Sequence, residues 1–169
     1  MFKDIAFSEL AKETLEQIKS GAFLVVQDGD KANIMTIGWG SIGFIWKRPV
    51  FTVLVRYSRY TYELLEKVNE FTVNFPLQNN MNQELSFCGT KSGRDVDKFM
   101  ECRLTPVPAK KVAAPVIKEC DYFYECRIVC RQAMQPALVD EEIISTSYPN
   151  GDFHMLYYGE ILASYKKIR

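Results

Sequence analysis

The sequence of 169 residues contains no run of the ~18 apolar residues that a membrane-spanning helix needs. Its first residues, which include Asp4, Glu9, Lys12 and Glu13, lack the apolar core of a signal peptide. It also lacks an excess charge of either sign, because 21 Lys and Arg balance 21 Asp and Glu. No bulk positive field is available for nucleic acid or anionic lipid. We therefore expect a cytoplasmic protein with no nucleic acid and no membrane partner.

A CxxC pair is also missing, and the number of cysteines is odd. Both facts argue against a disulfide framework and against a zinc ribbon. Cys126 and Cys130 are four residues apart, which in a strand places both on one face with Ile128, as small buried hydrophobes. We expect reduced thiols and no metal site.

The chain has one histidine, no internal repeat and no low-complexity linker. Its length suits a single domain over residues 1–169. Aromatic residues are abundant, with 11 Phe, 9 Tyr and 2 Trp. Such side chains fill a core, cover a flat ligand or line an oligomer interface.

Periodicity and turn residues divide the chain into short elements. They predict helices over 8–19, 62–68, 79–87 and 94–101. They predict strands over 22–26, from 32 onward, and over 50–55, 70–75 and 122–134. A further hairpin is expected to pair 143–148 with 153–165 across the Pro-Asn-Gly-Asp turn at 149–152.

Residues 56–61 read Arg-Tyr-Ser-Arg-Tyr-Thr, between an apolar run and a helix-like segment. A strand would deliver Arg56 and Tyr57 into a turn, and Ser58 or Thr61 would cap the next helix. Guanidinium, hydroxyl and backbone N–H groups would then converge on one point, which suits a phosphate monoester. The alternative is an ordinary N-cap at Ser58 beside two solvated arginines.

Residues 33–43 carry three glycines, which is unusual for a strand. Asn33, Thr36 and Ser41 lie among large apolar residues, and Trp39 stands between two glycines. The pattern is typical of the wall of a planar-ligand site, with free backbone groups at the ligand's edge and an indole near its face. The alternative is a bulged strand with a core tryptophan.

A tight polar loop, Gly-Thr-Lys-Ser-Gly, occupies residues 89–93. Such a loop can lay Lys91 and its own N–H groups against an anion. A glycine-flanked surface turn explains the same residues equally well.

Blocks of sequence follow one another along most of residues 22–165. They are Asn-Ile-Met-Thr-Ile-Gly-Trp-Gly-Ser at 33–41, Pro49, Arg-Tyr-Ser-Arg-Tyr-Thr at 56–61, Phe-Thr-Val-Asn-Phe-Pro at 71–76, Cys-Gly-Thr-Lys-Ser-Gly-Arg-Asp-Val-Asp-Lys-Phe at 88–99 and Tyr-Gly-Glu-Ile at 158–161. In content and order they resemble the flavin reductase-like family of FMN-binding split β-barrels, which includes flavoredoxins.

The resemblance implies a mainly β fold, a six-stranded antiparallel Greek-key split barrel with peripheral helices. It implies FMN as cofactor, NAD(P)H as a possible co-substrate, and a homodimer that buries FMN near the subunit boundary. The residues then expected to bind FMN are Asn33, Met35, Thr36, Trp39, Gly40, Ser41, Arg56, Tyr57, Ser58, Arg59, Thr61, Lys91, Ser92, Gly93 and Tyr157.

His154 is the candidate catalytic residue, on the nicotinamide side. In two-component flavin reductases, a Gly-Asp-His segment at this place resembles a nicotinamide-binding element. Here one extra residue, Phe153, precedes the histidine. Some relatives also carry a histidine late in the long strand, where this chain has Arg131 and Gln132. A structural histidine at the start of a strand is the alternative.

FMN carries its own redox chemistry, so no Ser-His-Asp set is needed. The leading hypothesis is an NAD(P)H-dependent FMN oxidoreductase that passes electrons to free flavin, a redox partner protein or a metal complex. The second is a non-enzymatic electron carrier of flavoredoxin type. The third is a module that binds another phosphorylated heterocycle.

Overall fold

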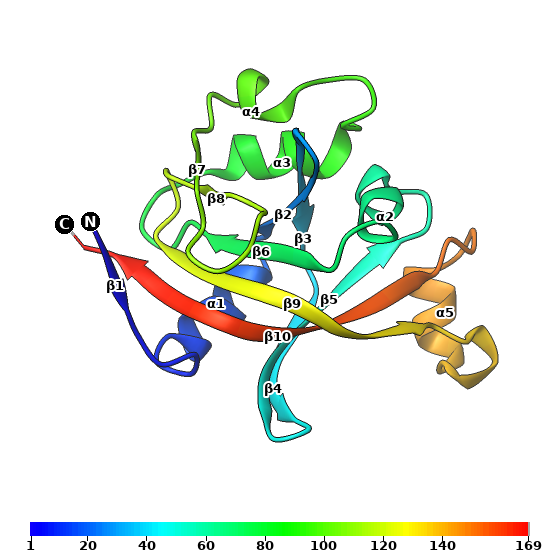
Figure 1. The fold of residues 1–169 in the computed structure, drawn as a ribbon. Coiled ribbons are helices and arrows are strands. Elements are labelled where there is room, and N and C mark those ends of the chain that lie inside the picture. Colours follow the sequence, from blue (N-terminus) through cyan, green and yellow to red (C-terminus); the bar gives the residue numbers. More distant parts are fainter. Residues whose placement is uncertain (169) are drawn as a thin grey trace.

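The computed structural model describes residues 1–168, in which strands predominate over short helices (Figure 1). The strands are β1 (Phe2–Asp4), β2 (Ala22–Asp28), β3 (Lys31–Ile37), β4 (Gly40–Ile45), β5 (Arg48–Arg56), β6 (Glu70–Phe75), β7 (Pro106–Val107), β8 (Val116–Ile117), β9 (Tyr122–Ala133) and β10 (His154–Lys167). The helices are α1 (Ala11–Ile18), α2 (Tyr60–Leu65), α3 (Asn82–Thr90), α4 (Lys98–Glu101) and α5 (Glu141–Ser147), with a 3₁₀ turn at Pro136–Leu138.

One antiparallel sheet has the strand order β3-β2-β6-β9-β10-β5-β4, and β1 pairs with the far end of β10. The predicted mainly β, antiparallel class is confirmed. The six consecutive strands from β3 to β5 are extended by β4 and β1, so the sheet has eight strands. Strands β7 and β8 form a separate small sheet.

The two ends of this strand order lie close together in the chain. Only Gly38 and Trp39 separate β3, at one edge, from β4, at the other. A two-residue link cannot span an open sheet of this width, so the sheet curls into a barrel. Between β3 and β4 the described residues form no ladder, which leaves the barrel split.

Strand β2 is buried on both faces because side chains alternate along a strand. Leu24 and Val26 belong to the main core inside the barrel. Phe23 and Val25 belong to a second apolar cluster, with Leu85 of α3. The second cluster anchors α3, and the loop that follows α3 forms part of the site described below.

The predicted strand over residues 143–148 is wrong, because residues Glu141–Ser147 form helix α5. The β-branched pair Ile143 and Ile144 favoured a strand. The Asp140 side chain, however, accepts a hydrogen bond from the Glu142 N–H at 2.9 Å and caps a helix. Strand β10 pairs instead with β5 and β9.

Within residues 1–168, no helix has both the length and the apolar character to cross a membrane. The same part of the chain holds no cluster of His, Cys, Asp and Glu that could bind a metal ion. All five cysteines are free.

Candidate functional site

The hexapeptide 56–61 connects the end of β5 to α2, as the sequence predicts. Arg59, and neither Ser58 nor Thr61, occupies the N-cap position of α2, and its side chain makes no capping bond. Its Nη1 donates instead to the Gly89 carbonyl at 2.8 Å. Arg59 thereby ties the hexapeptide to the C-terminal turn of α3.

A cavity of about 130 Å³, here called the polar cavity, lies between β3, this hexapeptide and the loop after α3. Eight of the predicted FMN-binding residues meet there, although they come from three separate segments. Its lining consists of Asn33, Met35, Ser58, Arg59, Tyr60, Thr61, Thr90, Lys91, Ser92, Gly93, Arg94 and Lys98.

Close packing of backbone against side chain closes one wall of the polar cavity. The buried Asn33 amide donates to Thr61 Oγ1 at 2.9 Å. A Cβ atom at Gly93 would lie 1.9 Å from Asn33 Oδ1. Only glycine allows the loop to approach Asn33 this closely, which explains the glycine that the sequence places at 93.

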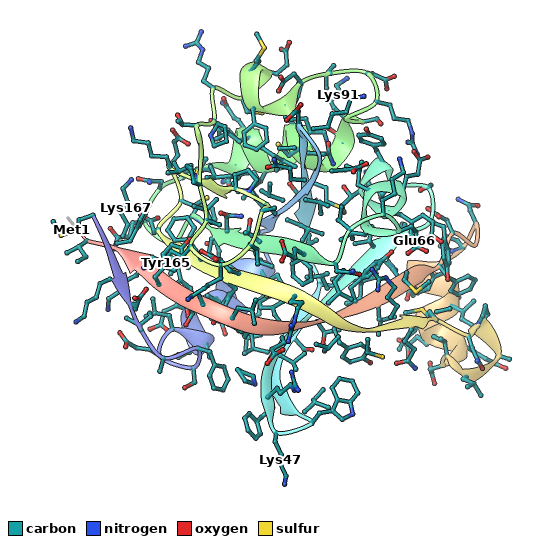
Figure 2. All side chains as sticks on the ribbon, viewed as in Figure 1. Met1, Lys47, Glu66, Lys91, Tyr165 and Lys167 are labelled. Atoms are coloured by element: carbon teal, nitrogen blue, oxygen red, sulfur yellow. The ribbon has the colours of Figure 1, made fainter. Side chains whose placement is uncertain are left out.

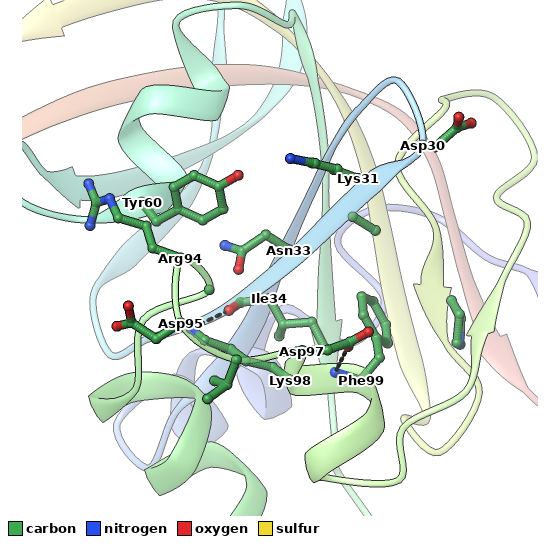
Figure 3. Close-up of a pocket in the computed structure, with 14 residues that line it drawn as sticks. Asp30, Lys31, Asn33, Ile34, Tyr60, Arg94, Asp95, Asp97, Lys98 and Phe99 are labelled. Atoms are coloured by element: carbon green, nitrogen blue, oxygen red, sulfur yellow. Dashed lines mark hydrogen bonds between the residues drawn. The ribbon is translucent and has the colours of Figure 1, made fainter.

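Lys98 is a lining residue that sequence reasoning missed. It is 5% exposed, and its Nζ donates to the Ile34 and Cys88 carbonyls at 2.7 and 2.9 Å (Figure 3). Burial lowers the pKa of this amine. Its position in a charged segment gave no signal of burial, because a solvated lysine fits that pattern equally well.

A second cavity, of about 150 Å³, adjoins the first and is here called the aromatic cavity. Both cavities are lined by Met35 and Arg59. The other residues that line the aromatic cavity are Thr36, Ile37, Gly38, Trp39, Leu54, Arg56 and His154. Together the two cavities form one site with a cationic, polar end and an aromatic end.

Trp39 is 45% exposed and stands beside the His154 ring, with centroids 5.2 Å apart. The core alternative for this tryptophan is therefore excluded. Gly40 has a packing role, since an added Cβ would lie 2.9 Å from Ile18 Cδ1 and 3.0 Å from the Thr52 carbonyl oxygen.

His154 is buried, and its Nδ1 lies 2.7 Å from the Tyr148 hydroxyl. Burial, and then the positive charge of Arg56, lower the pKa of His154 to about 4. Burial raises the pKa of Tyr148. The sequence analysis did not single out Tyr148, because the predicted strand over 143–148 hid its position at the end of a helix.

In the structure, the hydrogen-bond donors of Arg56 and Ser58, predicted to bind a phosphate, bind other groups of the protein. Arg56 Nη1 and Nη2 donate to the carbonyls of Asp152 and Ser147, at 2.8 and 2.9 Å. The Ser58 N–H and Oγ donate to the two carboxylate oxygens of Asp152, at 3.1 and 2.6 Å. Arg56 thus binds two carbonyls and Ser58 binds the exposed Asp152 carboxylate, and the binding of a phosphate by these residues stays a prediction.

Four predicted residues lie outside both cavities. Tyr57 is exposed, with its ring 5.0 Å from that of Tyr62. Tyr157 is buried in the core, and its hydroxyl donates to Glu66 Oε1 at 3.0 Å. Gly40 and the exposed Ser41 belong to β4.

A larger, open groove of about 740 Å³ borders the polar cavity and shares with it the lining residues Asn33, Tyr60, Gly93, Arg94 and Lys98 (Figure 3). Its rim mixes charges of both signs. The acids are Asp30, Asp95 and Asp97, and the bases are Lys31 and Arg94. The mixed rim and the scarcity of predicted residues favour the two smaller cavities as the candidate site.

Residues 15–166 match the family described as the flavin reductase like domain. An uncharacterized protein of Archaeoglobus fulgidus is 33% identical over 140 residues, which cover 83% of this chain and 68% of that protein. The crystal structure of flavoredoxin from Methanosarcina acetivorans is 30% identical, with a TM-score of 0.68 over 87% of this chain and 68% of its own. An NADH:FAD oxidoreductase of Streptomyces globisporus is 15% identical and shares the fold, with a TM-score of 0.66 over 98% and 89% of the two chains.

Proposed function

The chain belongs to the flavin reductase like domain family, and on that premise we propose that it is an FMN-binding, NAD(P)H-dependent oxidoreductase. Bound FMN would supply the redox chemistry, accepting hydride from NADH or NADPH and passing electrons to a flavin, a protein or a metal complex. The residues of the chain bind and orient the two ligands.

The observation that carries this proposal is the pair of cavities joined at Met35 and Arg59. Arg59, Lys91 and Ser92 line the polar end and would hold the phosphate. Trp39 and Thr36 line the aromatic end and would contact the isoalloxazine ring. A hydrogen bond to a charged group contributes on the order of 1.5–3 kcal/mol.

The first test is a fluorescence titration with FMN and with riboflavin, which lacks the phosphate. We expect one FMN per chain and a clear preference for FMN. The absorbance spectrum of the protein as purified shows independently whether flavin is bound. Equal affinity for the two flavins would contradict the assignment of the polar cavity.

A flavoredoxin-type electron carrier is the second candidate, favoured by the 30% identity to the flavoredoxin of Methanosarcina acetivorans. Anaerobic addition of NADH or NADPH separates the two functions. Rapid bleaching of the flavin supports the oxidoreductase, whereas stable flavin absorbance supports the carrier. A purified protein that is colourless and does not bind FMN would favour a site for another phosphorylated heterocycle.

We also propose a homodimer, supported by the hairpin of β4 and β5, which projects from the barrel with Lys47 at its tip (Figures 1 and 2). Phe44 and Trp46 on this hairpin are 65% and 56% exposed. Exposed apolar groups of this size favour association. Light scattering tests this, and a monomer that still binds FMN tightly would contradict it.

We also propose that the protein is cytoplasmic, because five free thiols suit a reducing compartment.

A further inference from the structure

His154 lies at the centre of a compact cluster of side chains that ends in the aromatic cavity. Tyr148 and His154 are 3% and 7% exposed. The Tyr148 ring stacks on Phe153 at 4.6 Å and lies edge-on to the imidazole at 5.5 Å, and the Trp39 ring lies 5.2 Å from the imidazole and 6.3 Å from the Tyr148 ring. Packing on several sides leaves the imidazole little freedom to turn.

The Tyr148 hydroxyl fixes which imidazole nitrogen carries the proton. Its hydrogen-bond partner among residues 1–168 is His154 Nδ1, at 2.7 Å. A buried hydroxyl that found no acceptor for its proton would lose free energy. The hydroxyl therefore donates to Nδ1, and a neutral ring then carries its own proton on Nε2.

The charges that face His154 oppose a second proton. Arg56 and Arg59 disfavour the imidazolium, Asp152 favours it, and burial disfavours it most. Tyr148 faces the ring as a neutral hydroxyl. The pKa of about 4 means that His154 is neutral at physiological pH.

Arg56 also fixes the chain on both sides of this cluster. Its guanidinium lies over the Tyr148 ring, 5.0 Å from the centroid. Its two hydrogen bonds to the Ser147 and Asp152 carbonyls bracket Tyr148 and lead directly to His154. One arginine therefore controls the position of the tyrosine and the charge near the histidine.

We propose that Tyr148 and Arg56 are positioning residues that present His154 as a neutral Nε2–H donor to a carbonyl oxygen of a planar ligand in the aromatic cavity. The carbonyl belongs either to the flavin ring or to a nicotinamide carboxamide. That choice of ligand rests on the proposed function, whereas the state of His154 does not.

His154 is the single histidine of the chain, so NMR of protein labelled with ¹⁵N-histidine reports on it without ambiguity. In the flavin-free protein we expect the Nε2–H tautomer and no titration from about pH 5.5 to 8. In Tyr148→Phe, the preference between the two neutral tautomers should weaken, whereas the pKa of His154 should stay low, because burial and the positive charge of Arg56 remain. Titration of the wild-type ring near 6.5, or an Nδ1–H tautomer, would overturn the proposal without the need for any variant.

Tyr158→Phe is the matched control. Tyr158 lies on β10, the strand of His154, and its hydroxyl donates to Gln132 Oε1 at 2.9 Å, away from the cluster around His154. This variant also loses one tyrosine hydroxyl but should leave the His154 signals unchanged. An equal change in both variants would overturn the assignment to Tyr148.

The ligand is identified by two additions to the labelled protein. FMN is added first, followed by 1,4,5,6-tetrahydro-NADH, a nicotinamide that does not donate hydride. A shift of the Nε2–H signal with FMN assigns the acceptor to the flavin, and a shift only at the second step assigns it to the carboxamide. Bound FMN with no shift at either step would overturn the donor role, whereas failure to bind FMN at all would overturn the proposed function and leave the tautomer result standing.

Discussion

Arg56 and Arg59 stand three residues apart in one hexapeptide, and the structure uses them differently. Arg56 gives its guanidinium to two main-chain carbonyls of the turn after α5. Arg59 donates to the Gly89 carbonyl and faces both cavities. The first arginine organises the chain around His154, whereas the second lines both cavities, where we propose that it binds the phosphate of the ligand.

The difference follows from the elements that carry the two residues. Arg56 is the last residue of β5 and pairs directly with His154 of β10, so its side chain stays with the turn that leads into β10. Arg59 lies beyond the turn, at the start of α2, and donates to the C-terminal turn of α3. Two identical side chains thus make different contacts, because the chain turns between the end of β5 and the start of α2.

The largest expected effect is a pH dependence of the free energy of unfolding, and it concerns His154, the residue that Arg56 positions. Unfolded chain binds a proton at His154 below its ordinary pKa of 6.5, whereas the folded protein binds it only below about 4. Between these values the unfolded state holds more protons, so stability falls as pH falls from 6.5 to 4. The loss should reach at most about 3 kcal/mol.

Urea denaturation of the wild type and of His154→Gln across this pH range measures that loss. The carboxylates titrate in both proteins, so their contributions cancel, and the difference in free energy of unfolding between the two proteins should change with pH through His154 alone. Parallel curves for the two proteins would contradict the buried, neutral histidine.

The next effect separates the two arginines directly. Arg59→Met should weaken FMN binding by about 1.5–3 kcal/mol, because a charge-assisted hydrogen bond to phosphate is lost. Its affinity for riboflavin should change little. Arg56→Met, the matched control, should keep the preference for FMN and instead raise the pKa of His154. Fluorescence titrations with both flavins provide the measurement, and a selective loss of FMN binding in Arg56→Met alone would reverse the roles.

Trp39→Ala tests the aromatic end and should have a smaller effect. Loss of an aromatic contact should weaken FMN binding by roughly 0.5–1.5 kcal/mol and shift the flavin absorption. Stability should fall only modestly, because Trp39 is 45% exposed, whereas truncation of a core tryptophan costs about 3–5 kcal/mol. A large destabilisation of the flavin-free protein with unchanged FMN affinity would refute the role in the site.

The smallest effect compares two serines that the sequence analysis placed in one site. Ser92 lines the polar cavity beside Arg59, whereas Ser41 is exposed on β4 and lies outside both cavities. Ser92→Ala should weaken FMN binding by about 0.5–1.5 kcal/mol. Ser41→Ala should stay within about 0.5 kcal/mol of the wild type in both binding and stability. Equal losses of FMN affinity in the two variants would contradict the assignment of Ser41 and β4 to a position outside the site.

Local sequence patterns were sufficient for much of the fold. The strands expected over 22–26, from 32 onward, over 50–55 and over 122–134 follow from patterns among neighbouring residues, and β2, β3, β5 and β9 form there. The segment 143–148 failed because its β-branched residues and its helix cap gave opposite local signals.

By itself, the sequence indicated the segments 33–43, 56–61 and 89–93 as candidates, and residues from each of them line the two cavities. Only the tertiary structure decided which side chains within them face the cavities. The Asp152 carboxylate meets Ser58 across 94 residues, and Arg59 meets Gly89 across 30. Contacts at such separations depend on how the sheet curls, which no local pattern reports. They decide that main-chain carbonyls hold the Arg56 guanidinium beside the aromatic cavity, whereas Arg59 lines both cavities.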